Sequence, residues 1–334
     1  MTKAFVKLLT ALSLWLATPV QGADWRIQPG PSLWGARGGL EFGIYPASVS
    51  GRGDGGPRGL IRLGYPSLPH GRYALINFIA VEPIVNGRRG FSELERSQLD
   101  GAPGKRFWVD PAAIRVQAVH PRDSGSGARP PFATEQLEVT LRAEKFDNGA
   151  HVYLVATQRR DAPDEVAFTV HAEGDSAPMD CCILTATMGN MTRARELWLT
   201  NQVVSSLRLY PTYHRDQFAP HATFPRARLR TTPAGDVMVA ITGDEAAPAT
   251  VHPFPGADDW YYGGGRVTQY WRVPAGSVQN DLAAVVNGRF TYWQSRQPVP
   301  GGIAFENFEM RQRFRDGQQL IFGITRRPPS ALGW

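Results

Sequence analysis

The chain has few of the features that most readily reveal an enzyme from its sequence. Its 334 residues include two cysteines, which are adjacent, and four lysines against 32 arginines. It contains no H-E-x-x-H, G-x-S-x-G, C-x-x-C or P-loop motif. Their absence excludes the simplest metallopeptidase, esterase and kinase interpretations. Beyond the N-terminus, no apolar run reaches the ~20 residues that span a bilayer.

Residues 1 to 22 predict a cleaved secretory signal peptide. Lys3 and Lys7 give a positive start, residues 8 to 17 an apolar core, and Val20-Gln21-Gly22 a small-residue cleavage site. Removing the segment lowers the net charge from +6 to +4, because it holds two of the 36 basic residues and no acidic one. We therefore expect a secreted or periplasmic protein with no membrane span in its mature form and no nucleic acid as partner.

The two cysteines cannot link distant parts of one chain, because Cys181 and Cys182 are neighbours. A disulfide between them would close a strained eight-membered ring. In the apolar stretch MDCCILTATM we expect two free thiols on one strand, facing opposite ways.

The basic side chains that remain after removal of the signal peptide are almost all arginine, and the planar guanidinium group suits carboxylate and sulfate ligands.

The fold class follows from many short runs of period-two hydrophobicity, punctuated throughout by 35 glycines and 27 prolines. Asn148-Gly149 separates two such runs and predicts a hairpin. We predict an all-β fold, a large antiparallel β-sandwich of jelly-roll or supersandwich type. The expected strands lie within 72–85, 136–146, 151–160, 165–174, 236–244, 266–274, 288–297 and 319–327.

Helical signals are few, so only short helices are expected. Residues 91–101 offer Ser92 as a cap and Gly101 as a stop, and residues 190–202 carry apolar side chains at helical spacing. We expect a single β-sandwich domain over residues 23–334. The segment 123–132, DSGSGARPPF, is either a linker after an N-terminal subregion 23–122 or a long surface loop of one sandwich.

The richest cluster of reactive side chains lies in YPTYHRDQFAPH, residues 210–221. In a polysaccharide lyase, Arg215 would neutralise a sugar carboxylate while His214 or Tyr213 removed the neighbouring proton. Asp216 and His221 would bind the substrate. The alternative is a proline-bounded connection between strands with its polar groups in solvent.

The same stretch supplies candidate zinc ligands. His214 and His221, with His252 and Asp258 or Asp259, include suitable ligand types. Their spacing matches no compact metal motif, so we predict no metal and no cofactor.

A second candidate is GGIAFENFEMRQRF, residues 301–314. As a strand it places one carboxylate on each largely apolar face, Glu306 on one and Glu309 on the other. A buried carboxylate is costly unless paired, and Arg311 or Arg313 can supply the pair. The functional alternative makes either glutamate a general acid with a raised pKa. A glycosidase would need a second carboxylate, for which the candidates are Asp180, Asp216 and Asp259.

The third candidate is an aromatic stretch, Trp260, Tyr261 and Tyr262, before three glycines. Its rings would serve as a sugar platform or would cover the core. An exported, strand-rich chain with these clusters resembles sandwich-fold carbohydrate enzymes at the level of the fold, and a fold alone does not fix a function. We expect a protein that binds a polysaccharide or oligosaccharide and cleaves it, as a polysaccharide lyase or glycoside hydrolase. The alternative is a non-catalytic glycan-binding or cell-envelope protein.

Overall fold

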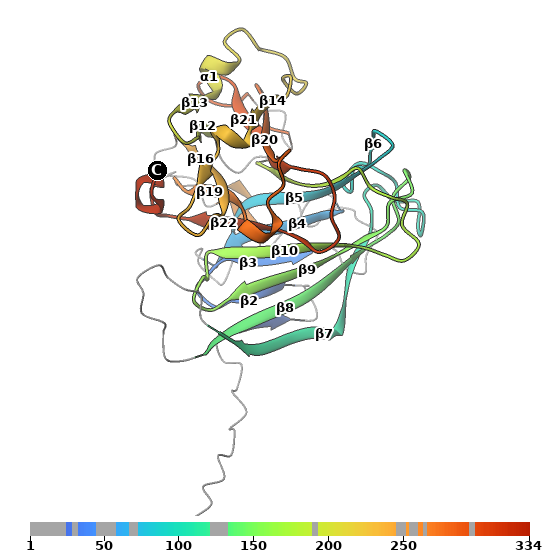
Figure 1. Cartoon of the computed structure of the whole chain (residues 1–334). Coiled ribbons are helices and arrows are strands. Elements are labelled where there is room, and N and C mark those ends of the chain that lie inside the picture. The colour runs from blue at the N-terminus through green and yellow to red at the C-terminus, as the bar shows by residue number, and fades with distance from the viewer. Residues whose placement is uncertain are drawn as a thin grey trace, which may run out of the picture.

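The computed structural model describes residues 25–28, 33–44, 58–66, 73–120, 133–188, 193–244, 252–253, 260–262, 266–293 and 298–334. These residues form an all-β sandwich of two sheets, which confirms the predicted fold class (Figure 1). The predicted signal peptide and the segment 123–132 lie outside the described residues.

The larger sheet has twelve strands. Its continuous order is β1-β2-β3-β4-β5-β11-β21-β20-β14, with β6 and β18 also paired to β5, and β17 paired to β18. Strands from near the N-terminus are therefore hydrogen-bonded into one sheet with strands from the C-terminal third. The bounds are β1 (Trp25–Gln28), β2 (Leu33–Ala36), β3 (Glu41–Ile44), β4 (Leu60–Tyr65), β5 (Tyr73–Val85), β6 (Arg88–Arg89), β11 (Cys181–Thr187), β14 (Ala222–Pro225), β17 (His252–Pro253), β18 (Trp260–Tyr262), β20 (Ala283–Arg289) and β21 (Ala304–Arg311).

The smaller sheet has ten strands. Its order is β13-β12-β16-β19-β22-β10-β9-β8-β7, with β15 paired to β16. The bounds are β7 (Phe107–Val119), β8 (Thr134–Ala143), β9 (Val152–Arg159), β10 (Glu165–Ala172), β12 (Ala194–Trp198), β13 (Val203–Ser205), β15 (Arg230–Thr231), β16 (Val237–Gly243), β19 (Thr268–Val273) and β22 (Gln318–Thr325). Among the described strands, every pair is antiparallel except β18 with β5.

Helices are few and short, as the sequence predicts. The described residues contain one α-helical turn, α1 (Ser206–Leu209), and three 3-10 turns, η2 (Arg226–Arg228), η3 (Ala275–Ser277) and η4 (Pro329–Leu332). None of these helices is long and apolar enough to cross a membrane.

The core fills the space between the sheets with alternate side chains of each strand. Its largest fully buried members include Trp34, Trp271, Phe308 and Phe322. The indole N–H of Trp271 donates to the carbonyl of Phe308 at 2.8 Å, which joins β19 of one sheet to β21 of the other. The side chain of Gln158 makes a second link between the sheets, since its amide accepts from Ala36 N–H at 2.7 Å.

Most predicted strands are confirmed, and so is the Asn148-Gly149 hairpin, which joins β8 to β9. Cys181 and Cys182 are buried free thiols on β11, as predicted, and only Cys182 belongs to the core between the sheets. The prediction for 288–297 is wrong in its position, because the strand is β20 and ends at Arg289.

Both predicted helices are wrong. Residues 91–101 form turns rather than a helix, because Ser92 fastens this loop to the neighbouring strands. Its hydroxyl donates to Gly59 O at 2.6 Å and accepts from Val81 N–H at 2.8 Å. Within 190–202, residues 194–198 are strand β12, whose backbone pairs with β13 and β16.

Candidate functional site

A cavity of about 370 Å³ opens on the outer face of the twelve-stranded sheet. Alternation along β11 shows which face this is. Cys182, Leu184 and Ala186 belong to the core, so Thr185 and Thr187 point outward. The cavity is lined by Leu60, Glu82, Arg89, Phe91, Glu93, Leu94, Thr187, Phe218, His221, Asn287, Trp293 and Asn307.

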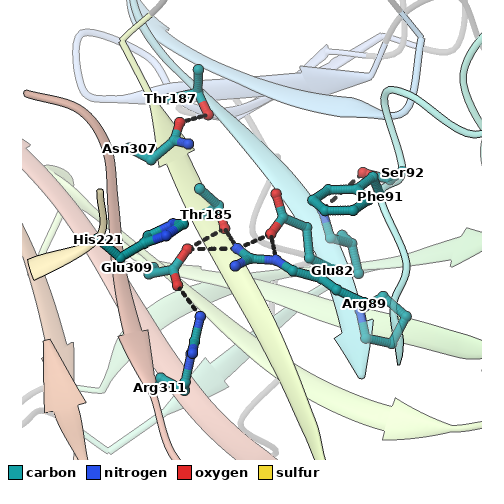
Figure 2. Close-up of polar contacts among 12 residues, drawn as sticks. Glu82, Arg89, Phe91, Ser92, Thr185, Thr187, His221, Asn307, Glu309 and Arg311 are labelled. Carbon is teal, nitrogen blue, oxygen red and sulfur yellow. Dashed lines mark hydrogen bonds and ion pairs between the residues drawn. The ribbon is translucent and has the colours of Figure 1, made fainter. Parts of the chain in front are cut away.

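Strand register brings the polar side chains of this face together. On β11, Thr185 is opposite Glu309 of β21 and Thr187 is opposite Asn307. On the other side of β11, Ile183 is opposite Glu82 of β5. Residues from β5, β11 and β21 therefore meet at one place although they lie far apart in sequence (Figure 2).

A tight hairpin between β5 and β6 places Arg89 over this cluster. Asn86 and Gly87 both have positive φ, at 49° and 73°, which matches the type I′ turn that joins antiparallel strands. The turn pairs Arg89 of β6 with Ile84 of β5. The Arg89 side chain then lies beside Glu82, and its guanidinium carbon is 5.5 Å from the centre of the Phe91 ring.

Arg89 bridges two buried carboxylates (Figure 2). It forms an ion pair with Glu82, and its Nη2 also donates to Glu309 Oε2 at 2.8 Å. The Thr185 hydroxyl donates to the same Glu309 oxygen at 2.8 Å, while Arg311 Nη2 donates to Glu309 Oε1 at 3.0 Å. Glu309 is thus fully buried and paired, as the sequence predicts, with Arg311 as one of its two arginines.

Burial shifts the titration of the acids that line the cavity. It raises the pKa of Glu82 from 4.5 to about 8, because loss of solvent outweighs the attraction of Arg89. Burial also raises the pKa of Glu93 to about 7. Glu93 Oε2 is buried and has no hydrogen-bond partner among the described residues. Both carboxyl groups therefore keep their protons to a higher pH than an exposed glutamate does.

His221 completes the polar lining and comes from the residue before β14. Burial lowers the pKa of His221, against the opposite effect of Glu309, so the imidazole is neutral at pH 7. Its Nε2 lies 3.4 Å from Asn287 Nδ2 on β20. With Asn307, these groups form a set of neutral donors and acceptors facing the cavity.

Apolar side chains form the rest of the wall. Phe218 and Leu94 line the cavity and remain 40% and 60% exposed. Phe91 and Trp293 are half-buried at the same cavity. Flat rings next to neutral polar groups suit a ligand that has both an apolar face and hydroxyl groups.

The loop 210–221 contributes differently from the sequence-based hypothesis. Phe218 and His221 reach the cavity, whereas Tyr213, His214, Arg215 and Asp216 do not line it. The Tyr213 hydroxyl is within hydrogen-bond distance of the carbonyls of Gln217 and Phe218, at 2.9 and 2.8 Å, and so closes the loop on itself.

The other side chains of that cluster point elsewhere. His214 packs edge-on against the Phe290 ring at 5.2 Å, and Arg215 and Asp216 are exposed. The predicted lyase arrangement of His214, Tyr213 and Arg215 around one sugar is therefore absent from the described cavity.

The structure describes the remaining predicted residues only in part. Glu306 is buried and does not line the cavity; it lies next to Phe305, where a bulge shifts the register between β20 and β21. For Trp260, Tyr261 and Tyr262 the structure describes the backbone, which forms β18 and pairs with β17 and β5. His252 is likewise described by its backbone, and Asp258 and Asp259 lie outside the described residues. Within the part that is described, no group of three or more potential ligands could hold a metal.

Sequence reasoning missed Glu82, Arg89 and Glu93, which dominate the site. One signal was available in Glu82, a single carboxylate inside the apolar stretch INFIAVEPIV. Such a residue demands a buried partner. The partner, however, could not be identified from local sequence. Comparisons of the chain with protein-family models, curated proteins and solved structures found no match.

Proposed function

We propose that the protein acts on a glycan in the cavity over β5, β11, β21 and β20, as an exported glycoside hydrolase. One observation carries the proposal. A cavity of about 370 Å³ combines the aromatic side chains of Phe91, Phe218 and Trp293 with two carboxyl groups whose pKa values are raised by burial to about 8 and about 7. Sugar recognition uses ring faces, and glycosidic cleavage uses a pair of carboxyl groups with different protonation states.

The two acids take different roles. Glu82, with the higher pKa, holds its proton at neutral pH and donates it to the oxygen of the leaving sugar. Glu93, with a pKa near 7, accepts a proton from the attacking water. The neutral imidazole of His221 and the amides of Asn287 and Asn307 bind sugar hydroxyl groups.

Hydrolysis fits the cavity better than lyase chemistry. A lyase needs a cation that is free to neutralise the sugar carboxylate. Among the described lining residues the cation is Arg89, and it is already paired with Glu82 and Glu309. A neutral sugar therefore suits this cavity better than a uronate.

The test is turnover by the purified protein on a panel of neutral and acidic polysaccharides. New reducing ends support hydrolysis, and ultraviolet absorbance from an unsaturated product supports a lyase instead. Glu82→Gln and Glu93→Gln should each lower the rate by about 100-fold or more, while Glu173→Gln, on the other sheet, should leave it unchanged. Full activity of both cavity variants would overturn the assignment.

Non-catalytic glycan binding is the second candidate, and the Arg89 network favours it. A guanidinium held by two carboxylates is a common structural device, and it ties up the Glu82 oxygen that faces it. Under this alternative the wild type binds a glycan without cleaving it. Trp293→Ala should then lose binding, whereas Glu93→Gln should retain it.

A further inference from the structure

Two adjoining hollows lie at another place, where β16 and β22 end and β19 begins. These strand ends lie near the C-terminus in Figure 1. One has a volume of about 440 Å³ and the other about 240 Å³. Both are lined by Arg326 and Arg327, which directly follow β22. Tyr65, Pro66 and Asp164 line the larger hollow, and Trp198 and Pro328 line the smaller one.

The charge of these hollows is positive. Their lining holds three arginines, Arg266, Arg326 and Arg327, against the single carboxylate of Asp164. The Asp164 carboxylate accepts a hydrogen bond from the Tyr65 hydroxyl at 3.1 Å. This excess of cations contrasts with the first cavity, where Arg89 faces two carboxyl groups.

Among the described residues, one of these cations has no ion-pair partner. Arg266 pairs with Glu196 at 3.2 Å, and Arg327 donates to the carbonyl of Ala331. Arg326 is exposed, and its side chain has no hydrogen bond or ion pair with any described residue, although its charge acts on the nearby Tyr65. Its guanidinium group is thus available to grip a carboxylate or sulfate in the bidentate manner that such groups favour.

A flat apolar wall stands beside the arginines. The indole N–H of Trp198 donates to the Thr242 hydroxyl at 3.1 Å, which fixes the ring on the outer face of the sheet. Trp198 also packs against the cluster of Met238, Ala240 and Tyr270. Pro328 continues the wall of the same hollow. Rigid rings next to a free guanidinium provide stacking and charge recognition together.

We propose that these hollows form a second binding site, which takes an acidic polysaccharide through Arg326 and stacks one of its sugar rings on Trp198. A nucleic acid is the less suitable polyanion, because single strands are bound by several aromatic side chains along a long basic groove. The site goes beyond the proposed hydrolysis and does not depend on it. It binds acidic units, whereas the first cavity suits a neutral sugar.

The experiment measures binding by the full chain, without turnover, by calorimetry at several salt concentrations. The probes are polygalacturonate for carboxylates, heparin for sulfates, dextran as a neutral polymer and a single-stranded DNA oligonucleotide. The key variant is Arg326→Glu. Its matched control is Arg313→Glu, which makes the same charge change at a side chain that is 85% exposed on another part of the surface.

At least one acidic polysaccharide should bind at least about tenfold more tightly than dextran. Arg326→Glu should weaken that binding by about tenfold or more and lower the salt slope by about 1 or more. Arg313→Glu should change it by less than about twofold. Trp198→Ala should weaken it as well, and Glu82→Gln should not. The proposal is overturned if Arg313→Glu weakens binding as much as Arg326→Glu, if dextran binds equally well, or if DNA binds as tightly with the same dependence on Arg326.

Discussion

Arg89→Met should destabilise the protein strongly at pH 8, because Arg89 is the cation shared by two buried carboxylates. The side chains of Glu82 and Glu309 are 5% and 1% exposed. Removing one partner of such a network leaves buried charge uncompensated, which costs about 3–5 kcal/mol in comparable cases. Methionine keeps most of the length and apolar surface of the arginine stem, so the loss reports on charge rather than on volume.

The loss should depend on pH. Burial raises the pKa of Glu82 even beside Arg89, and loss of the cation raises it further, while in the unfolded chain this carboxyl group ionises near the usual 4.5. Below that pH Glu82 is neutral in both states, so its part of the penalty vanishes. Urea unfolding of the wild type and the variant should therefore differ most at pH 8 and least near pH 4.5.

A compensated variant separates charge from packing. Glu82→Gln/Arg89→Met/Glu309→Gln removes all three charges, and it should recover at least half of the stability lost at pH 8. A deficit below about 1 kcal/mol at pH 8, in the range of an exposed ion pair, would refute the reasoning. A deficit that is equal at pH 5 and pH 8 would refute it as well.

Three further predictions follow from the same structure. Between pH 4.5 and about 7, Glu93 is protonated to a greater extent in the folded state than in the unfolded state. The free energy of unfolding of the wild type in urea should therefore decrease as pH rises through this range, and Glu93→Gln should make this decrease smaller. Gly323→Ala should lower the unfolding free energy, measured by thermal unfolding, by about 1–3 kcal/mol, because its Cβ would lie 2.0 Å from Cζ of Tyr270. The control Gly174→Ala meets nothing within 4 Å and should be neutral in the same measurement. His214→Ala should leave glycan turnover and binding unchanged, and a loss of either would assign His214 to the site.

Period-two hydrophobicity predicted the sandwich well because each strand buries one face against the other sheet. The pattern says less about where a strand stops. GRFTYWQSRQ, 288–297, has the composition of a strand, yet β20 ends at Arg289. This residue pairs with Ala304, which is the first residue of the partner strand β21. A Cβ at Gly288 would lie 2.7 Å from Ala304 O, so the bulge beside it requires glycine.

Short helical patterns were misleading for a related reason. Ala194 and Leu197 are three residues apart, which fits one helical turn. They also both face the core from a strand, because a bulge between Ala194 and Glu196 changes the alternation. The backbone hydrogen bonds that residues 194–198 make with β16 outweigh those of a single helical turn.

The site divides into a part that local sequence can predict and a part that it cannot. Alternation predicted a largely apolar face for Glu309, and a buried carboxylate needs a cationic partner. Arg311, two residues later, is one such partner. The second cation, Arg89, is 220 residues away in the chain. Local periodicity gives the face on which a side chain lies and says nothing of which strand lies beside it.

The same limit applies to loop 210–221, of which Phe218 and His221 line the cavity and Tyr213 to Asp216 do not. Tyr213 and His214 are reactive residue types, but Tyr213 can satisfy its hydroxyl with carbonyls four and five residues away, a purely local use. Glu82 has no such option, because it points out of an extended strand among apolar neighbours. A carboxylate inside a buried strand is thus a stronger pointer to a site than a loop rich in reactive residues. Its charge must be paired across strands or neutralised by a proton, and both outcomes create chemistry at that position.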